Sequence, residues 1–290
     1  MKSMTLGERA GSGGIYLLLI LISAVCFFPL LYVVVISVTP EAEIVRKGIV
    51  LVPEAVTWSA YKEMLTPRHG LWNAYQVTLF RTIVGTSLSL FFTAITAYPL
   101  SRRYLPGRSV FLLYVVFTML FSGGLIPTYL LVRSLGMLNT VWALIVPGLI
   151  SAFNLVIMKG FFEQLPVEIE ESARVDGAGD MSILLKIIVP LSLPVLTTIG
   201  LFYAVWHWNS YFDAVMYIHK ADQMPLQVVL RNILLNVQSL NNDLLNEDQP
   251  VGTMALQMSA VVLSTLPILL VYPFIQKHFT KGVLLGSIKG

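Results

Sequence analysis

The chain has 290 residues, of which 56% are hydrophobic and 12% charged, and its mean hydropathy is +0.76. A soluble domain carries about 25% charged residues, so this composition excludes an ordinary water-soluble protein and indicates one that spans a lipid bilayer. The net charge of +3 comes with no dense run of Lys or Arg, which argues against a nucleic-acid interface, and the single cysteine, Cys26, excludes a disulfide framework.

Six charge-free runs along the chain are long enough to cross a bilayer. A hydrocarbon core about 30 Å thick takes roughly 20 apolar residues of helix, because an unpaired backbone polar group in lipid costs several kcal/mol. None of the runs shows the sustained alternation of a barrel strand, so we predict an all-α membrane protein with six transmembrane helices. The runs are residues 15–38, 82–101, 109–132, 140–158, 187–212 and 253–276.

Basic residues in the flanking segments predict the orientation of these helices. If the N-terminus is cytoplasmic, the cytoplasmic segments hold the majority of the Lys and Arg residues. Cytoplasmic loops are enriched in Lys and Arg, so we expect both termini in the cytoplasm. The predicted organisation is a cytoplasmic tail at 1–14, a transmembrane domain at 15–276 with an outer loop at 213–252, and a cytoplasmic tail at 277–290.

One arginine and several prolines interrupt the apolar pattern. Arg81 lies at the outer end of the second run, and a charge at the bilayer centre costs about 2.5–3.5 kcal/mol, so we expect its side chain to reach the headgroups, with a functional role as the alternative. Prolines recur inside or beside the runs, where each removes a helical hydrogen bond and favours a kink. They are Pro29, Pro99, Pro127, Pro147, Pro190, Pro194, Pro267 and Pro273.

The segment 163–190, between the fourth and fifth runs, predicts a short amphipathic helix. Pro166 suits the first turn of a helix, and the glutamates that follow it place negative charge at the positive end of the helix dipole. These glutamates are Glu168, Glu170 and Glu171.

Glycines and an aspartate mark the far end of this helix. Gly177 and Gly179 can adopt the left-handed conformation that ends a helix, and Asp180 can cap a second helix that leads into the fifth run. Judged from the residues alone, such a helix-turn-helix either lies flat on lipid or docks into another protein.

The same segment resembles the EAA motif of binding-protein-dependent ABC importer permeases: E-A-A, three residues, G, nine residues, I-x-L-P. The spacing matches throughout, with Ser172 in place of alanine and Val189 in place of leucine. The segments 225–234 and 279–290, and the Asp-Gly-Ala triplet that begins at Asp176, are similar to the MalG/LplC-type permeases of carbohydrate importers. The motif positions are Glu171, Ser172, Ala173, Gly177, Ile187 and Pro190.

The resemblance implies the type I, MetI-like importer fold and a transport subunit without catalytic residues. It implies a second permease subunit as a heterodimeric partner, two cytoplasmic ABC ATPase subunits, an extracytoplasmic solute-binding protein, and a place in the bacterial cytoplasmic (inner) membrane. The chain has no G-x-x-x-x-G-K-[ST] phosphate loop, so ATP and Mg are expected on the partner ATPases and no cofactor in this chain. By the same resemblance the ATPase-coupling residues are Glu171, Ser172, Ala173, Asp176, Gly177, Ile187 and Pro190.

The cargo implied by the resemblance is a carbohydrate, with an oligosaccharide favoured. Two alternatives are an importer of a non-sugar solute (peptide, polyamine or amino acid) and a stand-alone secondary transporter. The charge-free runs argue against the second, because coupling to an ion gradient requires ionisable residues inside the spans.

Aromatic and amide side chains near the end of the fifth run are candidates for a sugar path, because rings stack on sugar faces and amides bond hydroxyls. The alternative is that Trp and Tyr collect at membrane interfaces whatever the function. Asn154, deep in the fourth run, needs a polar partner, either a neighbouring helix or the solute. The candidates beside it are Trp206, Trp208, Asn209 and Tyr211. The four histidines have no metal-ligand spacing and no nucleophile motif is present, so we expect no metal site.

Overall fold

The computed structural model describes residues 6–66, 70–243 and 253–287, and this part of the chain is helical without a strand. It divides into two compact units. The first unit comprises Met1–His69 and Leu230–Pro267, and the second comprises Gly70–Val229 and Ile268–Gly290. The last two helices, α13 (Leu226–Asp243) and α14 (Thr253–Ser287), each cross the division in sequence.

The first unit begins with a long apolar helix, α1 (Leu6–Ser37), followed by α2 (Glu41–Lys47) and α3 (Ser59–Met64). Most side chains of α1 are exposed from Ile15 onward, and among its described side chains the buried ones lie at its C-terminal end. There a small core forms around Ile36, Ile44 and Val50. A hydrogen bond of 2.7 Å between the hydroxyls of Ser37 and Tyr61 ties α3 to the end of α1.

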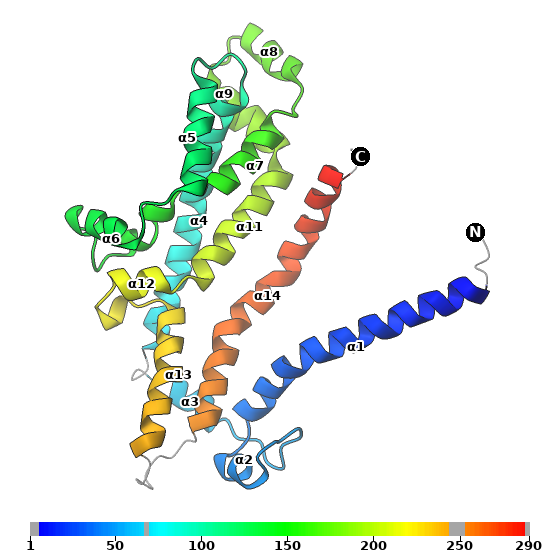
Figure 1. The fold of residues 1–290 in the computed structure, drawn as a ribbon, viewed down its shortest axis with the longest axis vertical. Helices are drawn as coiled ribbons and strands as arrows, with labels where there is room; N and C mark the ends of the chain where they lie inside the picture. Colours follow the sequence, from blue (N-terminus) through cyan, green and yellow to red (C-terminus); the bar gives the residue numbers. More distant parts are fainter. Residues whose placement is uncertain (1–5, 67–69, 244–252, 288–290) are drawn as a thin grey trace. The chain divides into compact units, whose positions relative to one another are not determined.

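The second unit holds the remaining helices, grouped around α4 (Figure 1). The helices α8 and α9 lie at one end of the α4, α5 and α7 group in Figure 1. In order, the elements are α4 (Leu71–Ser101), α5 (Arg108–Leu120), α6 (Leu125–Ser134), the 3₁₀ turns Val141–Leu144 and Val146–Gly148, α7 (Ala152–Phe162), α8 (Val167–Val175), α9 (Asp180–Ile183), a π-helical turn (Leu184–Ile188), α10 (Val189–Leu191), α11 (Leu193–Asn209), α12 (Phe212–Tyr217) and the 3₁₀ turn Ala221–Gln223.

A stripe of small side chains lets α4 approach its neighbours closely. Gly85, Ser89, Thr93 and Ala97 recur every fourth residue and are all buried, so they share one face of the helix. Small residues at this spacing are typical of membrane-helix contacts, where close backbone approach replaces the hydrophobic effect. The helix α4 accordingly packs against α7 and α11. The hydroxyl of Tyr203 on α11 bonds that of Thr93 at 2.8 Å.

The predicted spans correspond to three long helices and three bent pairs among the described residues. The long helices are Ser12–Ser37, Leu71–Ser101 and Thr253–Leu270. The pairs are Arg108–Leu120 with Leu125–Ser134, Val141–Gly148 with Ala152–Phe162, and Asp180–Leu191 with Leu193–Asn209, bent by 112°, 51° and 86°. By length and composition these are up to six crossings, if each bent pair counts as one.

The bends follow the prolines only in part. Pro190 and Pro194 flank the 86° bend, and Pro147 lies inside a 3₁₀ turn. In contrast, Pro29 and Pro99 lie within uninterrupted helices. The sharpest bend falls in the glycine-containing stretch 121–124, which ends three residues before Pro127 of α6.

Several predicted boundaries differ from the observed helices. The second run was expected from residue 82, yet α4 begins at Leu71, because Arg81 is accommodated inside the helix. The outer loop 213–252 contains all but the first residue of α12 and the whole of α13, and residues 244–252 lie outside the described part. The tail 277–290 was expected to follow the last span, but α14 continues without a break to Ser287, while 288–290 lie outside the described residues. The tail 1–14 already contains the start of α1 at Leu6.

Candidate functional site

The helix α8 has the ends that its sequence predicts. Pro166 is its N-cap, Glu168 and Glu170 lie in its first turn, and Asp176 is its C-cap. Gly177 follows with a φ of 84°, the left-handed conformation that glycine adopts at low cost, so its role as the helix-ending glycine is confirmed.

The turn after α8 differs from the prediction in two details. Gly179 has a φ of −77° and is the N-cap of α9, so it does not end α8. Asp180 is the first residue of α9 rather than its cap, and its carboxylate accepts a hydrogen bond from Arg174 instead. The guanidinium competes for this carboxylate because charge-assisted hydrogen bonds are about twice as strong as those of neutral donors.

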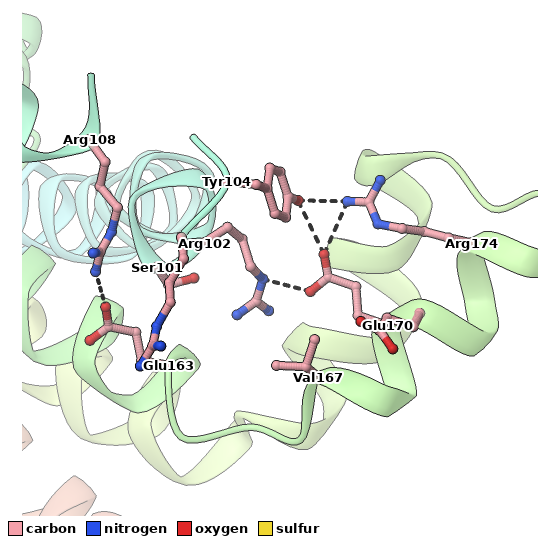
Figure 2. Close-up of a pocket in the computed structure, with 10 residues that line it drawn as sticks. Ser101, Arg102, Tyr104, Arg108, Glu163, Val167, Glu170 and Arg174 are labelled. Atoms are coloured by element: carbon pink, nitrogen blue, oxygen red, sulfur yellow. Dashed lines mark hydrogen bonds and ion pairs between the residues drawn. The ribbon is translucent and has the colours of Figure 1, made fainter. Parts of the chain in front are cut away.

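A buried carboxylate fixes α8 to the end of α4. The side chain of Glu170 is 4% exposed and forms an ion pair with Arg102, whose Nε lies 2.6 Å from Oε2 (Figure 2). The other oxygen, Oε1, accepts hydrogen bonds from the hydroxyls of Tyr98 at 2.9 Å and Tyr104 at 3.3 Å, and from Nη2 of Arg174 at 3.1 Å. The inner face of α8 is therefore held by four side chains, three of which come from α4 or the loop after it.

Burial and neighbouring charges shift the pKa values of Tyr104 and Arg174. Burial raises the pKa of the Tyr104 hydroxyl, and the charge of Glu170 raises it further. The hydrogen bond to Glu170 raises the pKa of the Arg174 guanidinium, with Asp180 acting in the same direction. Tyr104 therefore remains a donor and Arg174 remains charged throughout the physiological range.

The predicted coupling residues on α8 lie mostly on its open surface. Glu171, Ser172, Asp176 and Gly177 are exposed, and a Cβ built on Gly177 meets no heavy atom within 4 Å. Ala173 is half-buried and packs against the apolar core of the second unit. One face of α8 is thus fixed by Glu170, and the motif residues beside it are free to meet another molecule.

The rest of the motif lies beyond the turn. Ile187 is half-buried in the π-helical turn, and Pro190 is exposed in α10. A π-helical turn adds a residue to the helical turn and frequently marks a functional position. These two residues belong to the element that leads from α9 into α11.

A hollow of about 980 Å³ lies beside α8 (Figure 2). It is bordered on one side by an ion pair between Arg108 and Glu163, the latter also 2.8 Å from Nζ of Lys159. The residues that line the hollow are Ser101, Arg102, Arg103, Tyr104, Arg108, Glu163, Val167, Glu170, Glu171 and Arg174.

The five predicted substrate-path residues do not share one surface. Asn154 and Trp208 are buried, whereas Trp206, Asn209 and Tyr211 are exposed. Asn154 lies in the first turn of α7, where its backbone N–H donates to Oγ of Ser151. The amide of Asn209 donates to the carbonyl of Val205 on its own helix at 2.9 Å. Their role in a sugar path stays a prediction.

The expectation that Arg81 reaches the headgroups is wrong. Its side chain is wholly buried and forms an ion pair with Asp213 in the first turn of α12. Its guanidinium also donates to the carbonyls of Leu144 and Ser210, each at 3.2 Å, and lies 5.6 Å from the ring of Trp206. A buried guanidinium with a carboxylate and two carbonyls needs no headgroup, because Nη1 and Nη2 both already have acceptors.

Sequence reasoning missed the residues that hold the site together. Glu170 was assigned only to the helix dipole, Arg102 counted only as a basic residue flanking the second run, and Tyr98 lay inside that run without an assigned role. One signal was present, since Glu170 and Arg174 stand four residues apart, the spacing of neighbours on a helix surface. Tyr203 was also missed, although its hydroxyl bridges α4 and the N-terminal end of α7 through Thr93 and the backbone N–H of Ser151.

Comparison with known proteins decides the family. Residues 8–285 match the family described as binding-protein-dependent transport system inner membrane component. The chain belongs to this family. The predicted resemblance to ABC importer permeases is thereby confirmed, and the chain is a transport subunit rather than an enzyme.

Individual relatives cover nearly the whole permease. The polygalacturonan/rhamnogalacturonan transport system permease protein YtcP of Bacillus subtilis (strain 168) is 44% identical over 278 residues, covering 95% of this chain and 97% of YtcP. Protein LplC of the same organism is 46% identical over 271 residues, covering 93% of this chain and 91% of LplC.

A solved structure agrees with the helical fold of the permease. The crystal structure of a bacterial ABC transporter that imports the acidic polysaccharide alginate matches with a TM-score of 0.87 at 32% identity. The match covers 96% of this chain and 100% of the other. The permease therefore has the all-helical, MetI-like fold and is an integral membrane protein whose family works with a partner permease, an ATPase and a solute-binding protein.

Proposed function

We propose that this permease is the membrane-spanning subunit of an ATP-driven importer whose cargo is a carbohydrate, with an oligosaccharide as the expected form. Two named relatives support the cargo: YtcP is named for polygalacturonan and rhamnogalacturonan, and the solved transporter for alginate. A solute-binding protein would deliver the sugar, and two cytoplasmic ATPases that bind ATP and Mg would drive its passage.

The observation that carries the proposal is the two-sided character of α8. Its inner side is fixed to the permease through Glu170, whereas Glu171, Ser172, Asp176 and Gly177 are open. A helix held in this way transmits a push from a docked partner, because a rigid contact passes displacement on and a disordered loop absorbs it. We assign the ATPase to this open surface, with Ala173, Ile187 and Pro190 supporting it from the core side and the following turn.

The topology proposed for the permease has six crossings, each bent pair serving as one, with both termini in the cytoplasm of a bacterial cell and the chain in its inner membrane. The number of long and bent helices and the distribution of Lys and Arg support this arrangement. The sister permease is proposed to be a different chain, and Asn154, Trp206, Trp208, Asn209 and Tyr211 are proposed to contact the sugar.

Cross-linking from α8 tests the docking assignment. Cys26 is the chain's single cysteine, so Cys26→Ser gives a cysteine-free background. In that background Ser172→Cys, on the open surface of α8, should cross-link to the ATPase through a thiol-to-amine reagent. The matched control is Lys220→Cys, exposed beside a 3₁₀ turn in the proposed outer segment, which should not cross-link.

The same two variants test the orientation. A membrane-impermeant maleimide added to intact cells should label Lys220→Cys and spare Ser172→Cys. Labelling of Ser172→Cys from outside, or its failure to cross-link to the ATPase, contradicts the proposal.

Uptake by the complete importer tests the cargo. Proteoliposomes that contain both permeases and the ATPases are supplied with the binding protein. They should accumulate uronate or neutral oligosaccharides only when ATP is present on the same side of the bilayer as the ATPases. Accumulation of peptides, polyamines or amino acids without accumulation of any oligosaccharide would show that the cargo assignment is wrong.

A further inference from the structure

A buried carboxylate links α8 to a helix that is remote in sequence. Glu170 contacts Tyr98 in the last turn of α4, Arg102 at the C-cap of α4, and Tyr104 in the loop that follows (Figure 2). We infer that Glu170, one residue before the matched motif, is a positioning residue that passes the displacement of α8 directly to α4. This inference rests on the proposed docking of an ATPase on α8.

The partner of Glu170 is itself held in place. Arg102 is 9% exposed in its side chain, donates through Nη1 to the carbonyl of Phe162 at 3.1 Å, and lies with Cζ 4.9 Å from the ring centre of Tyr98. Because Phe162 is the last residue of α7, Arg102 joins the ends of α4 and α7. The carboxylate of Glu170 therefore binds a group that cannot follow it without moving both helices.

The neighbouring contacts strengthen the same junction. Nε of Arg108 donates to the carbonyl of Leu100 near the end of α4 at 2.8 Å, and its guanidinium forms an ion pair with Glu163 just after α7. Arg174 closes the other side by donating to Tyr104 at 2.7 Å and to Glu170. Glu170 is the member of this junction that lies on α8 and points inward, so it decides whether α8 and α4 move as one body.

A displacement of α8 could also pass into the permease through the chain connections at its two ends, but these transmit force less well than the contact of Glu170 with α4. The chain leaves α8 through a turn whose Gly177 has a φ of 84°, and it enters through residues 163–166, which form no helix of their own. Turns of this kind change conformation at low cost because glycine is conformationally permissive. The contact with α4 avoids both turns.

The helix α4 is suited to receive the displacement. It packs against α7 and α11 through its stripe of small residues, and Tyr203 bonds both Thr93 of α4 and the N-terminal end of α7. A shift of the α4 end therefore moves the helices that we assign to the sugar path. A buried ion pair contributes little net stability compared with an apolar contact, which favours a role in fixing position.

A double-mutant cycle in the complete importer tests the inference, because spatial placement alone does not demonstrate coupling. The quantities are oligosaccharide uptake per ATP hydrolysed and binding-protein-stimulated ATPase activity. Glu170→Gln should lower uptake per ATP about tenfold, the size typical of an interaction between contacting residues, while ATPase activity stays within about twofold of the wild type. The matched control, Glu168→Gln, removes an exposed charge from the same turn of α8 and should change neither quantity.

The remaining arms separate positioning from folding. Arg102→Gln should lower coupling to the same extent, and the double variant Glu170→Gln/Arg102→Gln should be no worse than either single variant. Glu170→Asp, which keeps the charge, should recover part of the coupling. If Glu170→Gln does not assemble, Arg102→Lys replaces it in the test. This variant keeps the positive charge but lacks the planar guanidinium, and it is expected to lose coupling.

Defined outcomes overturn the inference. One is wild-type coupling in Glu170→Gln or, if that variant does not assemble, in Arg102→Lys. A second is additive losses in the double variant. A third is a parallel fall of uptake and ATPase activity in Glu170→Gln together with a lower unfolding temperature. The docking proposal is judged separately by the Ser172→Cys cross-link, which should persist in Glu170→Gln. If the cross-link is absent in the wild-type background, the proposed function fails; if it is present and Glu170→Gln is fully coupled, only this inference fails.

Discussion

The buried ion pair between Arg81 and Asp213 gives a prediction in which the two partners are unequal. Arg81 is wholly buried in α4, whereas the side chain of Asp213 is 21% exposed. Asp213 also keeps two other donors, Oγ of Ser210 at 3.0 Å and the backbone N–H of Ala214 at 2.9 Å. Removing the carboxylate is therefore expected to cost more than removing the guanidinium.

The expected magnitudes follow from what each change leaves behind. Asp213→Ala leaves a buried guanidinium with only carbonyl partners, and breaking a buried pair in this way costs about 3–5 kcal/mol. Arg81→Met preserves the volume of the side chain and leaves a partly solvated, hydrogen-bonded carboxylate, which costs about 1–3 kcal/mol. The double variant leaves no unpaired charge, so its loss should fall about 2–3 kcal/mol short of the sum of the single losses.

Thermal unfolding of the purified permease in a mild detergent, at one fixed heating rate, measures the order of stabilities. The fraction that remains monodisperse after heating should fall first for Asp213→Ala, then for the double variant, then for Arg81→Met. Asp222→Ala, an exposed acid in the nearby 3₁₀ turn, should match the wild type. Equal losses for the two single variants, or strict additivity in the double variant, would refute the reasoning.

Three further predictions concern glycines and a hydroxyl. Gly177→Trp should leave insertion intact and reduce coupled uptake severely, because the new ring projects into open space where the ATPase is proposed to dock. Gly177→Asn should keep most uptake, because asparagine tolerates a positive φ, and full uptake by the tryptophan variant would contradict this prediction. Gly85→Ala should cost about 1–3 kcal/mol of stability and lower the unfolding temperature, because its Cβ would lie 2.5 Å from Nε2 of His207. Gly160→Ala, with open space around it, should leave the unfolding temperature unchanged, and equal effects of the two variants would contradict the close packing. Tyr203→Phe should cost about 1–3 kcal/mol by the same assay because a backbone N–H loses its acceptor, and no change would show that this bridge is dispensable.

Local signals made the helix α8 predictable. Pro166 at the start, glutamates in the first turn and Gly177 at the end act within one or two helical turns, so the boundaries of α8 follow from the residues themselves. The apolar runs likewise indicated the long helices, since the length of a span is set by the thickness of the bilayer.

Contacts between distant residues were not predictable in the same way. Glu170 meets Tyr98 from 72 positions away, and Arg81 meets Asp213 from 132 positions away. A single sequence assigns each of these charges to its nearest visible environment, a helix dipole for one and the headgroups for the other. The positions of the bends were unpredictable for the same reason. A proline predicts a weak point in a helix, but packing against distant residues decides whether the helix breaks there.

The burial of Arg81 also bears on how the permease is made. Its carboxylate partner is synthesised 132 residues later, and at about 5–20 residues per second the guanidinium waits on the order of ten seconds for it. During this interval α4 carries an uncompensated charge, which the insertion machinery tolerates at about 2.5–3.5 kcal/mol. Closure of α12 onto α4 is consequently a late event in biogenesis, and nascent chains that stop short of Asp213 should be preferred substrates for membrane proteases.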